Sequence, residues 1–283
     1  MLSILVSAMW ISPYLSNLKI QARIVLQYRA QAWAGVFTQG VFGFIRVSLM
    51  IALFKAQPLQ AMSLEQTVTY VWFTQMLLTF IAWGPDPLIS AMVKDGTLAY
   101  EMVRPVRLSL MWYMRSLSFR GVIPLMRGLP IMLIASLLPK PLRLTWPSIE
   151  GMSVMETATW ATTMVLCLAV AWLLAGAINN FINIAVVALM SDDGLVRLMP
   201  VVVFLFGGLI MPMPLFPDVM QGFIKAMPFV GIMDMPARVF SGHLAGIDAL
   251  MAILFQCVWL LAIVAINDLW LESRLKRAVI QGG

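Results

Sequence analysis

Long apolar stretches separated by short polar segments occupy most of the chain between residues 34 and 267. A helix needs about 20 mostly apolar residues to cross a bilayer, and six stretches come near or exceed that length. Backbone N–H and C=O groups must find partners inside the protein at that depth, so such stretches form helices. The pattern predicts an all-α, polytopic membrane protein with six transmembrane helices, at residues 34–54, 67–83, 122–138, 159–190, 195–211 and 247–267.

The residues before the first apolar stretch have the pattern of an amphipathic helix. Ser16, Lys19, Arg23 and Gln27 recur at helical spacing, and apolar residues fill the adjoining face. A helix of this kind lies in the plane of the membrane interface. We therefore expect an interface helix at residues 14–30, whose functional side chains are Lys19, Arg23, Tyr28 and Arg29.

Prolines and acidic residues predict where several of these elements end. Pro85 and Pro87 end the second span, because proline cannot continue a helix. Proline also recurs through residues 212–240, and this apolar sequence predicts a re-entrant extracytoplasmic segment packed against protein. The fourth apolar run is too long for one crossing, so we expect it to continue into the cytosolic interface as far as a turn at Asp192 and Asp193.

Composition and charge agree with this reading. Only 11% of the residues are charged, whereas soluble domains carry about a quarter, so a soluble protein is excluded and residues 1–283 form a single membrane domain. The net charge of +6 is spread over loops, which favours lipid headgroups over nucleic acid as partners. Most basic residues fall on the termini and on the second-to-third and fourth-to-fifth loops, which places both termini in the cytoplasm.

Catalytic and cofactor-binding motifs are missing from the sequence. The chain has one histidine, His243, and neither a G-x-S-x-G elbow nor a G-x-x-x-x-G-K-[ST] phosphate loop. Cys167 and Cys257 lie in predicted spans without C-x-x-C spacing and are expected in the interior. We therefore expect no enzyme activity, metal or cofactor in this chain, and any ATP dependence must come from a partner.

Four polar residues inside the predicted spans are candidates for a translocation path. Arg46 and Arg127 cost a few kcal/mol each to insert, so each should face protein or water, in contact with an anionic substrate group or with structural partners. Asn179 and Asn183 share a helix face and either line a polar path or form interhelical hydrogen bonds.

Three segments together resemble one family. They are LQYRAQAW before the first span, VKDGTLAYEMVRPV after the second, and MPLFPDVMQGFIKAMPFVGIMDMPARVFSG between the fifth and sixth. In their order and position they resemble the permease of a type-2 ABC exporter, in the branch with YRA before the first span and an RP-containing first cytoplasmic loop.

The resemblance implies a coupling role for residues 89–106, within a cytoplasmic loop at residues 88–115 that would contact a separate ATPase subunit. A short helix there would stop at Gly96 in the left-handed conformation, and Pro105 would end the next turn. Charge-assisted contacts to the ATPase would come from the charged members of the set Lys94, Asp95, Gly96, Leu98, Glu101, Arg104 and Pro105.

The same resemblance implies a bacterial cytoplasmic (inner) membrane protein that exports a substrate. The working unit would combine two ATPase copies, which bind ATP and Mg, with a second permease that is identical or homologous. An ion-gradient-driven secondary transporter and a non-transporting membrane scaffold are the alternatives. The first would show inverted repeats and ion-driven transport, and the second would bind no ATPase.

Overall fold

A computed structural model describes residues 2–56, 61–81, 83–146, 153–191 and 194–281. Within these ranges all regular structure is helical, as the apolar pattern predicts. The α-helices are α1 (Leu2–Gln27), α2 (Arg29–Ala56), α3 (Leu64–Leu77), α4 (Pro87–Lys94), α5 (Leu98–Met102), α6 (Leu108–Ser136), α7 (Val154–Leu189), α8 (Leu195–Phe206), α9 (Asp218–Ala226), α10 (Asp234–Phe240) and α11 (Gly246–Gln281). Three short 3₁₀ helices of the described chain are η1 (Leu78–Phe80), η2 (Met213–Leu215) and η3 (Pro228–Gly231).

In the described part of the chain, four helices are long and apolar enough to cross a membrane: α2, α6, α7 and α11 as far as Lys276. The 36 residues of α7 extend about 54 Å at the usual helical rise, more than the hydrocarbon core of a bilayer, about 30 Å. This length agrees with the prediction that the fourth apolar run continues beyond one crossing. The turn predicted at Asp192 and Asp193 lies outside the described residues.

The second and fifth predicted spans form shorter helices. α3 has 14 residues and α8 has 12. Both are shorter than the helix of about 20 residues that is needed to cross a bilayer. α3 gives way to η1, after which Ile81 is extended, and α8 ends just before Gly208, whose φ of +88° is left-handed. The predicted re-entrant segment at residues 212–240 forms η2, α9, η3 and α10.

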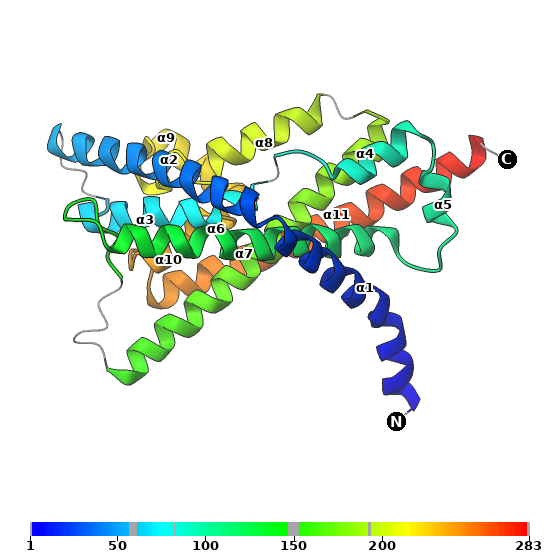
Figure 1. The fold of residues 1–283 in the computed structure, drawn as a ribbon, viewed down its shortest axis with the longest axis horizontal. Coiled ribbons are helices and arrows are strands. Elements are labelled where there is room, and N and C mark those ends of the chain that lie inside the picture. The colour runs from blue at the N-terminus through cyan, green and yellow to red at the C-terminus, as the bar shows by residue number, and fades with distance from the viewer. Residues whose placement is uncertain (1, 57–60, 82, 147–152, 192–193, 282–283) are drawn as a thin grey trace.

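The helices run along one long axis and alternate in direction (Figure 1). α2, α6 and α8 run toward the end that carries α9 and α10, whereas α3, α7 and α11 run back. The opposite end carries α4, α5 and the C-terminal end of α11. We refer to these as the α9–α10 end and the α4–α5 end.

The predicted interface helix corresponds to the second half of α1, and Tyr28 separates it from α2. α1 projects away from the other helices at its N-terminus and crosses α6 nearer its C-terminus (Figure 1). Two hydrogen bonds join them: Asn17 Nδ2 donates to the Met111 carbonyl at 3.1 Å, and Ser118 Oγ donates to the Leu18 carbonyl at 2.9 Å. The side chains of Lys19, Arg23, Tyr28 and Arg29 are exposed, and so are those of apolar residues of α1 such as Ile20.

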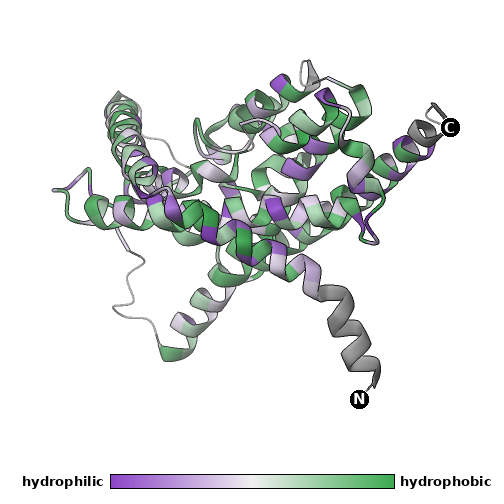
Figure 2. Ribbon diagram, turned by 45° about the vertical axis from the view of Figure 1, so that its right-hand side comes forward, coloured by the Kyte–Doolittle hydropathy of each residue, from purple (hydrophilic) through white to green (hydrophobic). Residues whose placement is uncertain are grey.

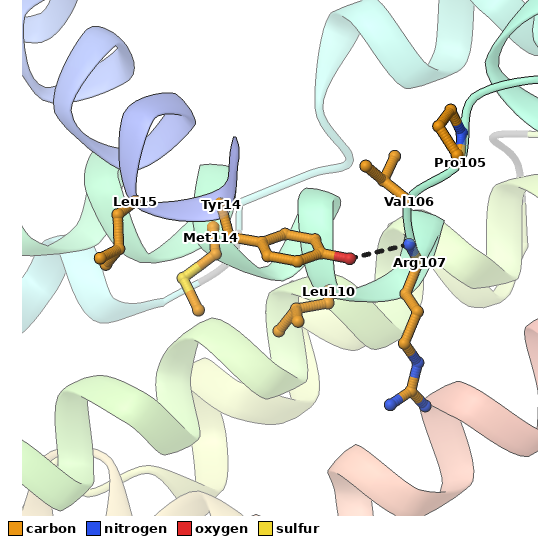
Figure 3. Close-up of a pocket in the computed structure, with 7 residues that line it drawn as sticks. All are labelled: Tyr14, Leu15, Pro105, Val106, Arg107, Leu110 and Met114. Carbon is orange, nitrogen blue, oxygen red and sulfur yellow. Dashed lines mark hydrogen bonds between the residues drawn. The ribbon is translucent and has the colours of Figure 1, made fainter. Parts of the chain in front are cut away.

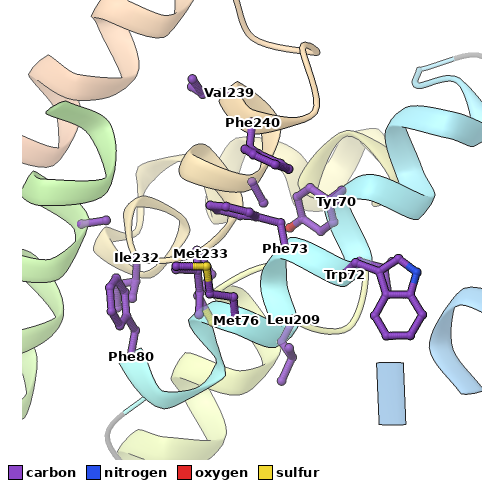
Figure 4. Packing of buried hydrophobic residues seen from close by; sticks show 14 of the residues in the cluster. Tyr70, Trp72, Phe73, Met76, Phe80, Leu209, Ile232, Met233, Val239 and Phe240 are labelled. Carbon is purple, nitrogen blue, oxygen red and sulfur yellow. The ribbon is translucent and has the colours of Figure 1, made fainter. Parts of the chain in front are cut away.

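α3 lies in the middle of the hydrophobic core at the α9–α10 end. Every residue from Thr67 to Leu77 is buried, because α2, α6 and α10 pack around this helix. The rings of Phe73 and Phe240 stack with their centroids 4.3 Å apart (Figure 4). Helix approach is close at Gly128 of α6, where a Cβ atom would lie 2.9 Å from the Cα atom of Met76.

The long helices consist largely of hydrophobic residues (Figure 2). Large exposed side chains occur along α2, α6, α7 and α11, among them Phe37, Leu133, Val165 and Leu261. Soluble proteins rarely expose contiguous apolar surface of this extent, whereas a bilayer covers it. The exposed apolar side chains therefore point to the same conclusion as the length and composition of the four long helices, which are those of a membrane protein.

Candidate functional site

The segment predicted to couple to an ATPase folds as two short helices. The Asp86 side chain accepts a hydrogen bond from the Leu88 N–H at 2.9 Å, and Pro87 occupies the first turn, so α4 begins with a regular N-cap. α4 ends at Lys94, and Gly96 has a φ of +68°, the left-handed conformation that the sequence predicts. The loop is shorter than the predicted 88–115, because α6 begins at Leu108.

The inner face of this segment is anchored to the long helices. Ile89 and Val93 are buried in a cluster with Trp112, Ile182 and Leu271, which come from α6, α7 and α11. This cluster belongs to the α4–α5 end and has different members from the core around α3. α4 therefore packs as part of the helix assembly.

Polar contacts reinforce this anchor at Asp86. Its carboxylate forms an ion pair with Arg115 of α6, in which the Arg115 Nη2 atom lies 3.3 Å from Oδ1. Its backbone N–H donates to Oδ1 of Asn183 at 2.8 Å. Asn183, a predicted path residue, thus ties the start of α4 to α7.

The outer face combines charged and apolar side chains. Lys94, Asp95, Arg104 and Pro105 are exposed, and Leu98 and Glu101 are partly buried. Glu101 and Arg104 form an ion pair at 3.0 Å. Tyr100 and Val103 are 76% and 82% exposed, although both side chains are apolar enough to favour burial. Mixed exposed apolar and charged groups are typical of a surface that another protein covers.

α1 contacts the same segment through a hydrogen bond of Tyr14. The Tyr14 hydroxyl accepts the backbone N–H of Arg107 at 2.9 Å, next to a pocket of about 520 Å³ (Figure 3). The Arg107 side chain points away from Tyr14, and its Nη2 atom lies 2.9 Å from Oδ2 of Asp268 in α11. Arg107 therefore links α1, the coupling segment and α11.

A second cavity, of about 480 Å³, lies between the α1–α2 junction, α6 and the residues that follow α3. It contains two predicted path residues, Arg127 and Asn179, and does not contain Arg46 or Asn183. Arg46 contacts α3 instead, where its Nη1 atom donates to Thr74 Oγ1 at 3.4 Å. The structure thus brings together half of the predicted path.

Arg120, which lies between the predicted loop at residues 88–115 and the predicted span at 122–138, is a residue of this cavity. It lies in α6, and its side chain donates to the carbonyls of Thr79 and Ile81 at 2.8 and 2.9 Å and to Asn179 Oδ1 at 2.6 Å. Those carbonyls are free for it because α3 and η1 end there. Nothing in the local sequence marks this role, since the partners lie about forty or more residues away.

A buried polar network at the α9–α10 end is also absent from the sequence predictions. Asp234 of α10 is 0% exposed, accepts the Met213 N–H at 2.8 Å, and forms an ion pair with Arg238 at 3.3 Å. Arg238 Nε donates to Nδ1 of His243 at 3.3 Å, and His243 Nε2 donates to the Ala61 carbonyl at 2.9 Å. A neutral histidine with its hydrogen on Nε2 satisfies both contacts.

The two cysteines are free thiols. Cys167 is buried as expected, and Cys257 is partly exposed. Among the residues that the structure describes, no group of three or more His, Cys, Asp or Glu residues could hold a metal ion. In comparisons with known proteins, no family model, no curated protein sequence and no solved structure matches this chain.

Proposed function

We propose that this chain is the membrane-spanning permease subunit of an ATP-binding-cassette exporter. It would form the translocation path, while a separate subunit binds ATP and Mg and hydrolyses the nucleotide at the α4–α5 end. The observation that carries this proposal is the α4–α5 segment, which exposes Tyr100 and Val103 outward while its inner face is buried among three long helices.

The contacts of that segment would let it transmit a displacement. α4 is tied to α6 and α7 through Asp86, and the residue before α6, Arg107, is tied to α1 and α11. Buried contacts such as Ile89 and hydrogen-bonded ion pairs resist separation. A partner that pushes on α4 and α5 would therefore move the ends of several long helices together.

In this proposal, α3 and α8 complete six crossings with the four long helices. Their alternating direction fits that topology (Figure 1). A short helix can serve at membrane depth when protein surrounds it, and α3 is surrounded in this way. The segment formed by η2, α9, η3 and α10 would then be the re-entrant extracytoplasmic element, with both termini in the cytoplasm and α1 in the interface.

The working unit would contain two ATPase subunits and a second permease, identical or homologous, in a bacterial cytoplasmic membrane. The test is purification of the tagged full chain from its native membranes in nanodiscs, with identification of co-purifying subunits and an ATPase assay on the eluate. We expect a nucleotide-hydrolysing subunit that is lost after the double change Lys94→Glu and Glu101→Lys. The change Lys225→Glu, on the exposed surface of α9, is the matched control and should leave the complex intact.

Recovery of the chain alone, without ATPase activity, would overturn the proposal. Transport driven by an ion gradient in vesicles that contain only this chain would then favour the secondary transporter. A complex with an ATPase that survives the double charge reversal would keep the permease function but move the contact away from α4 and α5.

A further inference from the structure

The cavity between α1, α2 and α6 has an unusual concentration of cationic and amide side chains. Its walls combine the end of α1 and the start of α2 with the residues between η1 and α4, the middle of α6, and Asn179 of α7. The polar side chains that line it are Gln21, Gln31, Gln39, Thr79, Asp86, Arg115, Ser116, Arg120, Arg127 and Asn179. Three of these are arginines, and in the described lining Asp86 is the one acid.

The carboxylate of Asp86 already has a partner. Asp86 pairs with Arg115, so it neutralises one of the three arginines. Arg120 and Arg127 face the cavity without a carboxylate partner among the described residues. The cavity therefore carries unbalanced positive charge inside a helix assembly, where charge is costly unless a counter-charge accompanies it.

Arg120 is only 5% exposed and keeps one donor unused. Its Nη atoms are occupied by the carbonyls after α3 and by Asn179, but its buried Nε–H has no hydrogen-bond partner within the described chain. Buried donors of charged groups are normally satisfied, so this one is available to a ligand. Its fixed Nη contacts hold the guanidinium in place.

Arg127 also has an Nε–H that is unpaired among the described residues, about two turns further along α6. Its side chain lies over Gly35 of α2, where a Cβ atom would clash with the guanidinium, so the glycine makes room for it. Its Nη2 atom lies 3.4 Å from the Gln31 carbonyl, and its Nε–H is buried with no described partner. Gln39 Oε1, which is buried in the same cavity, is likewise unpaired within the described residues and can accept from a hydroxyl group.

Two aromatic side chains of the cavity lining are well exposed. Trp83 and Phe119 are 59% and 53% exposed. An amphiphile can place its charged group near arginines and lay its apolar part along exposed aromatic rings. The cavity lining thus combines cationic side chains with exposed aromatic ones.

We infer that this cavity binds the anionic head group of an amphiphilic molecule, with a phosphate-type oxyanion contacting Arg120 and Arg127 and the apolar part lying against Trp83 and Phe119. The oxyanion would balance the positive charge of the two guanidinium groups that line the cavity, and a hydroxyl group of the ligand would donate to Gln39. The inference depends on the cavity alone and holds whether or not an ATPase joins this chain.

The test measures binding of three probes to the purified full chain in a neutral detergent, by native mass spectrometry and isothermal titration. The probes are dioctanoyl phosphatidylglycerol, dioctanoyl phosphatidylcholine and inorganic phosphate. We expect the anionic lipid to bind at least about tenfold more tightly than the zwitterionic one, since a charge-assisted hydrogen bond contributes that much or more. Arg127→Gln should weaken binding of the anionic lipid by a similar factor. Arg143→Gln, on an exposed loop, should leave that binding unchanged.

Trp83→Ala tests the apolar contact at a position that is 59% exposed. This change should weaken the binding of phosphatidylglycerol and leave the binding of inorganic phosphate unchanged. If phosphate binds as tightly as the lipid and depends on Arg127, the oxyanion site is upheld with a free anion as its ligand. Equal binding of the two lipids, or unchanged binding in Arg127→Gln, would overturn the inference.

Discussion

The hydroxyl group of Tyr70 lies 2.9 Å from Oδ1 of Asp234, and both side chains are completely buried. The same hydroxyl lies 2.7 Å from the carbonyl oxygen of Gly208, so its single hydrogen is shared between two acceptors. This contact joins α3 to α10 and to the turn after α8. It fixes the short helices of the α9–α10 end to the core, in a place where water cannot replace a lost partner.

Replacing the charge at Asp234 should destabilise this end strongly. In Asp234→Asn, Arg238 loses its carboxylate partner while remaining buried, and removal of one member of a buried ion pair costs about 3–5 kcal/mol. We expect the free energy of unfolding in detergent to fall by about 3 kcal/mol or more. Asp218→Asn, on exposed α9, should change it by no more than about 0.5 kcal/mol. Equal effects of the two changes would contradict the network.

The stability of the same region should depend on pH through His243. Partial burial, followed by the positive charge of Arg238, lowers the pKa of His243, although the hydrogen bond to Ala61 opposes this. The unfolded chain then takes up its proton first, near the ordinary histidine pKa of about 6.5. The contribution is complete above that pH and is lost as the pH falls toward the lower pKa of the folded protein.

The measurement is the thermal unfolding midpoint between about pH 7.5 and about pH 5.5, which bracket the ordinary histidine pKa. The wild-type midpoint should fall more steeply than that of His243→Gln. The glutamine amide can donate to Ala61 and accept from Arg238, as neutral histidine does, but it takes up no proton. Identical slopes would show that His243 does not titrate differently in the folded and unfolded chain.

Two helical glycines should respond in opposite ways to substitution by alanine. At Gly128 a Cβ atom would meet the backbone of Met76, so Gly128→Ala should cost about 1–3 kcal/mol of unfolding free energy. At Gly40 no atom lies within 4 Å of the added Cβ, so Gly40→Ala should stabilise the chain by about 0.5–1 kcal/mol through helix propensity. Chemical unfolding of the two variants, side by side, decides the point. A neutral Gly128→Ala would mean that α3 and α6 can move apart at no cost.

The hydrogen bond between α1 and Arg107 should protect that amide from solvent exchange. Tyr14→Phe removes the acceptor, and a typical net hydrogen bond of about 0.5–1.5 kcal/mol corresponds to roughly two- to tenfold faster exchange. Hydrogen–deuterium exchange of a peptide covering residues 103–112 measures this. Tyr28→Phe, at an exposed position, is the control and should leave the peptide unchanged. Unaltered exchange in Tyr14→Phe would place the protection of Arg107 elsewhere.

Local patterns were sufficient for the features that depend on nearby residues. The apolar runs locate α2, α6, α7 and α11 because length and hydropathy decide them. Gly96 was identified as a left-handed stop because its neighbours are a short helix and a polar turn. The break at Tyr28 lies within two residues of the predicted end of the interface helix.

Features that depend on residues far apart in the chain cannot be predicted from the local sequence. Arg120 lies outside every predicted span, yet it is buried and donates to carbonyls about forty positions earlier in the chain. Asp234 and Tyr70 are 164 positions apart, and no spacing rule connects them. Apolar length alone also predicted full spans at α3 and α8, whose actual ends are set by the turns that follow them.

The burial of α3 has a consequence for how the chain enters a membrane during synthesis. Thr69 and Gln75 are buried, so this helix presents a hydroxyl and an amide group that hydrocarbon alone would not accommodate, whereas the hydroxyl groups of Thr67 and Thr74 donate to nearby backbone carbonyls. Some of their partners come from residues made later, such as Thr145, which exchanges hydrogen bonds with Thr69. α3 is therefore expected to remain near the translocation machinery until the chain has been synthesised past Thr145, and to leave it together with α6.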